Sequence, residues 1–391
     1  MGVGNWFSCR EARGERNGKM IRINQIKLTP DKGKEELVQK ATKILRISEK
    51  EVLSLKIRKQ SIDARKKPNI MYVYTVDVEV SNEQKIMRRQ KGNQVTLIHE
   101  TPYDFPNSGT KKMEHRPVVI GSGPAGLFCA YLLAEHGYRP VVYERGASVE
   151  ERKKDVERFW NEQILNPNSN VQFGEGGAGT FSDGKLNTVV KDSSGRNRYV
   201  LETFVKFGAP SDILYDAKPH IGTDILAKVI KNMRDYLIKH GAEFRFQTCL
   251  KDIQIKENAL HALVTEDDTV IPADVAILAL GHSARDTFMM LHRHQLPMEA
   301  KNFAVGFRVE HPQQMIDDAM YGNGKRNALR LPAAPYKVTS NFPNGRGVYS
   351  FCMCPGGYVV NASSEEHRLA VNGMSYSDRG GSNANSAIIV S

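Results

Sequence analysis

The chain has 391 residues, of which 40% are hydrophobic and 25% are charged, as in a folded globular protein, and its length allows two or three domains. No apolar run approaches the ~20 residues that span a membrane, and residues 1–19 lack the apolar segment of a signal peptide, so we expect a cytoplasmic protein without membrane contact. The five cysteines include no C-x-x-C pair, which argues against a disulfide framework or a zinc site, and we predict no bound metal.

The net positive charge belongs to the N-terminal part of the chain. Residues 1–116 contain 25 Lys and Arg against 14 Asp and Glu, whereas residues 117–391 contain 30 of each. Such a surface could bind nucleic acid, but the basic run 58–67 lacks aromatic side chains that would stack on bases. We favour a small basic domain exposed to solvent, with no nucleic acid as partner, and keep a nucleic-acid-binding module as the alternative.

Residues 20–101 predict a small basic α/β domain, preceded by a polar extension, residues 1–19, to which we assign no structure. A helix is expected to begin at Thr29-Pro30-Asp31 and a short second helix is capped by Ser48. Strands are expected over residues 21–28, 53–62 and 70–80. With another short helix after Ser81, this β-α-β-β-α pattern has the size of a ferredoxin-like unit. Residues 102–116 read as a linker.

Residues 117–145 predict a nucleotide-binding βαβ unit. A buried strand leads into the spacing G-x-G-x-x-G, formed by Gly121, Ser122, Gly123, Pro124, Ala125 and Gly126. The first glycine permits a tight turn, the second lets the backbone approach a pyrophosphate, and the third lets the helix lie close to the strand. Glu144 follows the last glycine by 18 residues, where a carboxylate binds a ribose hydroxyl. NAD and FAD both fit. Glu144 argues against a 2′-phosphate, although the neighbouring Arg145 weakens that argument.

A second glycine cluster, residues 174–186, follows a charged helix expected over 148–165. It contains G-x-G-x-x-G and G-x-x-x-x-G-K spacings, but it lacks the strand, helix and acid of the first motif and the Ser or Thr of the second. We interpret it as a loop that presses backbone N–H groups against an anionic or planar ligand; the alternative is a purely structural loop. The cofactor-binding residues expected here are Gly177, Thr180, Ser182 and Lys185.

The rest of the chain predicts the remainder of a parallel sheet and then a β-rich domain. A helix over 225–237, a strand over 244–250, a small meander and a buried strand over 274–280 complete a Rossmann-like α/β domain. This domain has three layers around a central parallel sheet and comprises residues 117–300, with an insertion at about 148–212. Residues 301–391 read as a β-rich substrate domain. Its last strand, from residue 385, looks cut as it begins.

A series of segments resembles one known family. In order, they are GSGPAGLFCAYLLAEHG with YERG, GEGGAGTFSDGKL, KPHIGTDIL, LALGHSARD, FAVGFRVEHP and SFCMCPGGYVV. They resemble the bacterial FAD-dependent dehydrogenase family of largely unassigned substrate, within the glutathione-reductase-like flavoprotein superfamily. The resemblance implies FAD as cofactor, with Leu250 at the adenine and Gly281 as a second cofactor-side glycine. Such flavoproteins usually close the flavin end with a Gly-Asp pair, which is absent here; this suggests a C-terminally truncated chain that binds FAD weakly or does not fold fully.

The reactive groups are expected on loops at the ligand edge of the sheet. His220, Lys185 and His282 are the candidates for catalysis, with Arg285 near them. The structural alternatives are that His220 fixes a turn and that His282 and Arg285 begin a helix. The expected reaction passes a hydride between NAD(P)H, as a transient donor, and an unknown organic substrate. The rivals are an RNA-directed flavoprotein and a scaffold that holds FAD without turnover.

Cys352 and Cys354 form a C-x-C pair on a predicted strand. Regular alternation would put both sulfurs on one face, where a disulfide would close a small, strained ring. A redox role is one interpretation, and we favour buried, inert cysteines.

Overall fold

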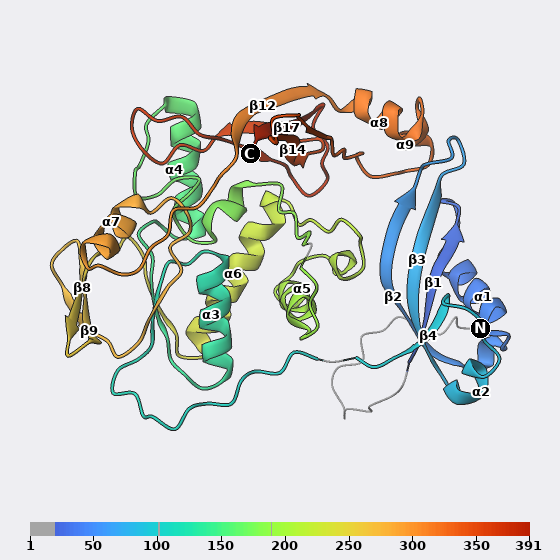
Figure 1. Cartoon of the computed structure of the whole chain (residues 1–391), viewed down its shortest axis with the longest axis horizontal. Coiled ribbons are helices and arrows are strands. Elements are labelled where there is room, and N and C mark those ends of the chain that lie inside the picture. The colour runs from blue at the N-terminus through green and yellow to red at the C-terminus, as the bar shows by residue number, and fades with distance from the viewer. Residues whose placement is uncertain (1–19, 101, 189) are drawn as a thin grey trace.

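The structure, a computed structural model, describes residues 20–100, 102–188 and 190–391. The polar extension predicted for residues 1–19 lies outside this part of the chain. Figure 1 shows a small N-terminal unit beside a larger body, with the C-terminal strands along the top of the view. Among the described residues, no helix has both the length and the apolar character needed to cross a membrane.

The N-terminal unit is a four-stranded antiparallel sheet with two helices. Its elements are β1 (Met20–Leu28), α1 (Lys34–Leu45), β2 (Val52–Asp63), β3 (Met71–Val80), α2 (Glu83–Met87) and β4 (Val95–Ile98). The strand order β2-β3-β1-β4 is a ferredoxin-like arrangement, in which β4 is an additional strand that the sequence analysis missed. Its core joins the sheet to α1 through residues such as Ile21, Val76 and Leu37.

Helix α1 begins later than predicted. Pro30 and Asp31 form a turn, and the helix starts after Gly33, whose N–H donates to the Glu36 carboxylate at 3.0 Å. By contrast, Ser48 caps a short 3₁₀ helix (Glu49–Glu51), as predicted.

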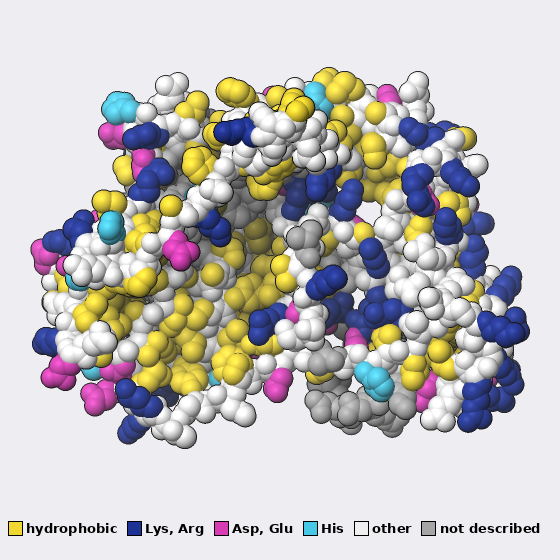
Figure 2. Space-filling model, in the orientation of Figure 1, with side chains coloured by type: hydrophobic (Ala, Val, Ile, Leu, Met, Phe, Trp, Pro, Cys, Tyr) yellow, Lys and Arg dark blue, Asp and Glu magenta, His cyan; other side chains and the backbone are white. Residues whose placement is uncertain are grey.

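Some of the basic residues of the N-terminal unit, including Arg58 and Arg65 of the basic run, form ion pairs within the protein. Figure 2 shows many Lys and Arg side chains over this unit. However, Arg22 and Arg58 both bind the fully buried Asp77 carboxylate, Arg22 with an Nε–Oδ1 distance of 2.7 Å. Arg65 binds Asp63 at 2.8 Å. These ion pairs use positive charge that the nucleic-acid alternative would direct at phosphates.

The edge strand β2 connects this unit to the larger body. The N–H of Gln60 donates to the Tyr215 carbonyl at 2.7 Å, and the Gln60 carbonyl accepts from the N–H of Ala217 at 2.9 Å. Two backbone hydrogen bonds therefore continue the sheet edge onto the segment that precedes His220.

The central unit is built on a parallel sheet of four short strands, ordered β11-β5-β6-β7. These strands are β5 (Val118–Ile120), β6 (Val141–Tyr143), β7 (Glu243–Arg245) and β11 (Ala276–Leu278). Helices α3 (Pro124–Glu135), α5 (Arg196–Lys206) and α6 (Thr223–Lys239) pack on one face around Val119 and Val142. The other face packs against an antiparallel sheet of β8 (Leu250–Lys256), β9 (Ala259–Thr265) and β10 (Val270–Pro272), together with α7 (Arg285–Arg293). The predicted three-layer α/β fold is confirmed.

Two strand predictions in this unit were wrong in detail. The strand expected over 244–250 is divided between β7 and β8, which belong to different sheets, because the chain turns at Gln247 with φ of 52°. The strand over 274–280 is shorter and lies at the sheet edge, where Leu278 is 39% exposed. An edge strand has one open side, which explains why this apolar run is not fully buried.

The C-terminal unit is rich in antiparallel strands, as predicted. One sheet has the order β12-β17-β14-β13 and contains β12 (Val305–Pro312), β13 (Thr339–Asn341), β14 (Gly347–Cys354) and β17 (Asn383–Val390). Strands β15 (Tyr358–Asn361) and β16 (Val371–Met374) form a hairpin. Helices α8 (Gln313–Tyr321) and α9 (Lys325–Ala328), which the sequence analysis missed, follow β12. Strand β17 begins two residues before the strand expected from residue 385, and it pairs with β12 and β14 on its two sides.

The C-terminal unit packs on α4 (Val149–Glu162), the predicted charged helix (Figure 1). Val156 of α4 shares a buried cluster with Val360 and Met374 of the hairpin and with Phe181. The residues around Phe181, Gly177–Phe181, form a short 3₁₀ helix at the end of the second glycine cluster. This contact fixes the second glycine cluster between the central and C-terminal units.

Candidate functional site

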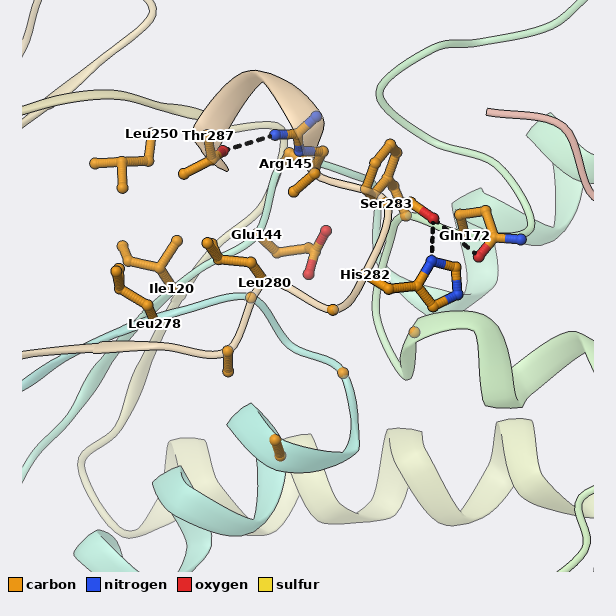
Figure 3. A pocket seen from close by; sticks show the side chains of 18 of the residues that line it. Ile120, Glu144, Arg145, Gln172, Leu250, Leu278, Leu280, His282, Ser283 and Thr287 are labelled. Carbon is orange, nitrogen blue, oxygen red and sulfur yellow. Dashed lines mark hydrogen bonds between the residues drawn. The ribbon is translucent and has the colours of Figure 1, made fainter. Parts of the chain in front are cut away.

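A cavity of about 580 Å³ opens at the edge of the parallel sheet where β5, β6 and β11 end (Figure 3). Both glycine clusters line it, the first through residues 121 and 123–125 and the second through residues 174 and 177–179. The remaining wall comes from the end of β6, from Thr248 and Leu250, and from the segment 278–291 that follows β11. Ligands bind at this edge in open α/β sheets, and two donor-rich loops meet there.

The first glycine turn has the shape that the motif predicts. Gly121 has φ of 97°, and a Cβ at this position would lie 2.5 Å from the Ala279 carbonyl oxygen at the end of β11. A Cβ on Gly126 would collide with the Gly121 carbonyl oxygen, so this glycine lets α3 lie on the turn. Gly123 caps α3 and Pro124 occupies its first turn. The start of α3, with its free N–H groups, therefore borders the cavity and suits a phosphate.

The Glu144 carboxylate is buried, and protein donors occupy it. One oxygen accepts from the Ser122 N–H at 2.7 Å and the Ser122 hydroxyl at 2.8 Å. The other accepts from the N–H groups of Gly146 at 2.9 Å and Gly174 at 3.1 Å. A carboxylate offers about four acceptor positions, so a ribose hydroxyl would have to displace one of these donors. Binding of ribose by Glu144 stays a prediction, while its hydrogen bonds tie the two glycine clusters together.

Arg152 of α4 holds the second glycine cluster from within the protein. Its side chain is fully buried, and the guanidinium donates to five backbone carbonyls at 2.7–3.3 Å, those of Asn170, Val171, Gly174, Glu175 and Gly177. Burial lowers the pKa of Arg152 to about 10, opposed by the nearby carboxylates. In a trans peptide the N–H points away from its C=O. Since the Gly177 carbonyl faces Arg152, the N–H of Ala178 points away from Arg152, and Ala178 lines the cavity.

Glu175 anchors the same loop to two helices. One carboxylate oxygen accepts from the Val149 N–H at 2.8 Å and from Arg234 of α6 at 2.6 Å. The other oxygen, Oε1, is buried without a partner. Burial raises the pKa of Glu175 to about 7, although Arg234 opposes the shift.

Arg145 is held by its neighbours at one end of the cavity. Its guanidinium lies over the Phe173 ring, 4.4 Å from the centroid. It also donates to Asp286 at 2.9 Å and to the Thr287 hydroxyl at 3.2 Å. Figure 3 places Leu250, the predicted adenine contact, beyond Thr287 on this side. Potential metal ligands of Cys249, Glu266 and Asp286 lie within 4.8 Å of one another, but Arg145 already pairs with Asp286, and we assign no metal there.

His282 is the one catalytic candidate on the cavity wall. Gly281, with φ of 70°, turns the chain after β11, and His282 follows it on the cavity wall. The Nδ1 atom of His282 lies 2.8 Å from the Ser283 hydroxyl, which in turn lies 3.5 Å from the Gln172 Oε1 atom. Figure 3 shows these three side chains together, away from Arg145.

Lys185 and His220 lie elsewhere. They pair with each other through a backbone bridge, and the Lys185 ammonium binds Asp183 at 2.9 Å. His220 lines a second cavity of about 830 Å³, which the N-terminal sheet and the C-terminal unit enclose. Its Nε2 atom lies 3.0 Å from the Ser377 carbonyl oxygen, and burial and Arg379 lower its pKa. The structure therefore brings Lys185 and His220 together but leaves His282 at the other cavity.

The remaining predicted residues support the site from outside its wall. The hydroxyl of Thr180 donates to the Glu175 carbonyl at 3.4 Å, and that of Ser182 donates to the Gly179 carbonyl at 2.7 Å. Arg285 begins α7 and binds Glu365 at 2.7 Å, which agrees with the helix-start alternative. Sequence reasoning also missed Arg152, because charged residues surround it in α4 and nothing local marks it as buried.

Three parts of the chain match known families. Residues 302–391 match "FAD-dependent protein, C-terminal domain-like", residues 119–149 match "NAD(P)-binding Rossmann-like domain", and residues 20–79 match a domain of unknown function. An uncharacterized protein of Clostridium beijerinckii is 46% identical over 371 residues, which cover 95% of this chain and 69% of that protein.

More distant similarities cover less of the chain. The thiamine thiazole synthase of Sulfolobus acidocaldarius is 34% identical over 74 residues, 19% of this chain and 24% of that enzyme. The solved structure of Thermovibrio ammonificans THI4 is 18% identical with a TM-score of 0.29, over 46% of this chain and 61% of that one. These two similarities carry no argument about the reaction.

Proposed function

Since this chain belongs to the FAD-dependent oxidoreductase family, we propose that it holds FAD in the cavity at the edge of the parallel sheet. We further propose that it passes a hydride between a reduced nicotinamide donor and an organic substrate. The observation that carries the proposal is the meeting of two glycine clusters and the start of α3 on one cavity.

The residues of the cavity suit the two ends of such a cofactor differently. Gly123 and the free N–H groups of α3 would bind the pyrophosphate, where backbone donors and the helix dipole favour negative charge. The N–H of Ala178, which points away from Arg152, would add a donor from the second cluster. Leu250 and Phe288 supply apolar wall for a flat ring. FAD, when bound, supplies the two-electron chemistry.

His282 is the group we assign to proton transfer. Its Nδ1 atom is engaged by the Ser283 hydroxyl at 2.8 Å, so Nε2 is the atom left to exchange a proton with a bound molecule. His220 lines the second cavity and Lys185 pairs with Asp183. We assign neither residue a role in this step.

The proposal is tested by titrating the FAD-free protein with FAD and following the quenching of flavin fluorescence. We expect saturable binding by the wild type and strong loss in Gly123→Val, because the new side chain would stand where the backbone must approach the pyrophosphate. Gly109→Val is the matched control, since a Cβ on Gly109 has no atom within 4 Å. Absence of binding by the wild type, or equal binding by both variants, would contradict the proposal.

Anaerobic bleaching of flavin absorbance by NADH or NADPH then identifies the donor.

A further inference from the structure

The C-x-C pair lies at an irregularity of β14, not on a regular strand. The pairing of β14 with β17 passes from Phe351 opposite Ala387 to Cys354 opposite Asn385, and Cys352 has φ of 47°. On a regular strand, residues two apart are separated by ~7 Å and their thiols do not meet. Here the bulge brings the Cys354 thiol to the backbone of Cys352, and this thiol donates to the Cys352 carbonyl at 3.4 Å. A non-glycine residue in the left-handed region is uncommon and is often found at functional sites.

Two cations lie against this thiol pair. The Lys185 ammonium lies 3.7 Å from the Cys354 sulfur, and the Arg308 guanidinium donates to the Cys352 carbonyl at 3.2 Å. The Cys354 thiol, Lys185 and Arg308 together lower the pKa of Cys352, against the effect of burial. By contrast, burial raises the pKa of Cys249 to about 12 and also raises that of Cys129. Cys352 is thus the nucleophilic thiol among the described cysteines.

An unpaired buried donor lies in the same group of residues. Asn385 is fully buried; its Oδ1 atom accepts from Arg308, but its Nδ2 atom has no partner among the described residues. Glycine at position 373 permits this close packing: a Cβ there would collide with Arg308 and lie 2.5 Å from both the Cys354 sulfur and the Asn385 Oδ1 atom. Buried donors are almost always paired, so this amide marks a place for an acceptor from outside the chain.

We propose that Cys352 and Cys354 form a thiol–disulfide exchange site that is oxidised by a small organic disulfide. Cys352 is partly exposed and reaches the disulfide first, whereas Cys354 is buried behind it and resolves the product. The site consists of residues of the C-terminal unit together with Lys185. It lies outside the cavity assigned to FAD.

Two exchanges complete the reaction. The Cys352 thiolate attacks one sulfur of the disulfide RSSR, the S–S bond breaks, and one thiolate RS⁻ leaves a Cys352–S–S–R bond. The Cys354 thiol gives its proton to that thiolate and attacks the Cys352 sulfur, which expels the second RS⁻ and forms the Cys352–Cys354 disulfide. The second thiolate takes its proton from water. The protein dithiol loses two electrons, and RSSR becomes two thiols.

The first test measures reactivity in the wild-type protein with its FAD bound. Iodoacetamide is applied at a series of pH values, and peptide mass spectrometry reports each cysteine separately. We expect Cys352 to react at lower pH than Cys129 and Cys249, because its neighbours lower its pKa whereas burial raises theirs; the latter two serve as slow internal controls. A rate at Cys352 no greater than that at Cys129 would overturn the proposal.

The second test follows the exchange itself, with glutathione disulfide as the probe. We expect the wild-type peptide that contains both cysteines to lose two hydrogens in mass and to regain them with dithiothreitol. Cys354→Ser should stop at a glutathione adduct on Cys352, and Cys352→Ser should give no adduct. Two free thiols in treated wild type would overturn the proposal even if a variant failed to fold. Because the readout is mass, failure to bind FAD would not affect it.

Lys185 is a positioning residue in this proposal. Lys185→Met should move the alkylation profile of Cys352 to higher pH, and Lys185→Arg should restore it, because the charge next to the thiols is what is lost. A profile unchanged in Lys185→Met would contradict this role.

Discussion

Gly123 and Gly177 lie next to each other in the wall of the cavity proposed to hold FAD: a Cβ on Gly177 would lie 3.2 Å from the Gly123 Cα atom. The two glycine clusters therefore touch backbone to backbone, although the sequence separates them by a helix and a loop. Glu144 strengthens this contact, since it accepts from Ser122 in one cluster and from Gly174 in the other. A side chain at this contact would push the two donor loops apart.

Gly177→Ala should therefore lower the free energy of unfolding by about 1–3 kcal/mol, because alanine at φ of 63° is strained and its methyl group would also press on Gly123. Gly179→Ala is the control, since its Cβ has no atom within 4 Å. Urea denaturation of the FAD-free proteins measures both. Equal stability of the two variants would show that the loops can separate without loss.

Replacement of Arg152 should be one of the most destabilising changes in the chain. Arg152→Met removes the donor to five buried carbonyls, and we expect a loss of at least about 3 kcal/mol together with loss of FAD binding. Arg158→Met on the same helix is the control, because Arg158 is exposed and pairs only with exposed Glu162. Its unfolding free energy should change by less than about 0.5 kcal/mol. Similar losses in both variants would argue against the role of Arg152.

Asp183 should give the folded protein a sensitivity to acid. The carboxylate is buried, which alone would raise its pKa, but Arg379, Lys185 and Ser375 outweigh burial and lower it. A carboxylate whose pKa is lowered on folding stabilises the protein above its ordinary pKa of ~3.9, and this stabilisation is lost as the pH falls.

Thermal unfolding midpoints between pH 3 and 7 test this effect. We expect wild type to lose stability below about pH 4, whereas Asp183→Asn starts lower and falls less steeply. Asp212→Asn, at an exposed position, should keep the wild-type slope. An unchanged slope in Asp183→Asn would mean that another group causes the acid transition.

His282→Gln separates binding from turnover at the proposed site. Because His282 lines the cavity but is not part of the glycine turns, FAD affinity should stay close to that of wild type. The rate of substrate turnover should fall by ~100-fold or more, the usual contribution of a general acid or base. His292→Gln, near the end of α7 and exposed, is the control. Equal rates for both variants would remove His282 from the mechanism.

The sequence predicted best the features whose cause is local. The strand, turn and helix at residues 118–135 follow from glycine spacing and an apolar run, and the 3₁₀ helix after Ser48 follows from a cap. Prediction from the sequence failed where contacts between residues far apart in the chain determine the structure. The division of residues 244–250 between two strands depends on the turn at Gln247. The hydrogen bonds of Arg152 to the second glycine cluster depend on how α4 packs.

The same distinction applies to the candidate site. The two glycine clusters were predicted from backbone requirements and Gly281 from the family resemblance, and all of them contribute to one cavity. Glu144 was predicted to face a ribose because its spacing matched, but spacing does not show that Ser122, Gly146 and Gly174 already occupy its oxygens. The bulge at Cys352 likewise has no local signal, since the sequence there alternates as a regular strand would.

The most direct test of the account is the identity of the cofactor that the purified protein carries. The protein is denatured, the released small molecules are separated by chromatography, and their absorbance and mass are recorded alongside Gly123→Val. We predict FAD from the wild type, taken up on addition if it was lost during purification, and none from the variant. A wild-type protein that releases no flavin and takes up no added FAD would contradict the central claim.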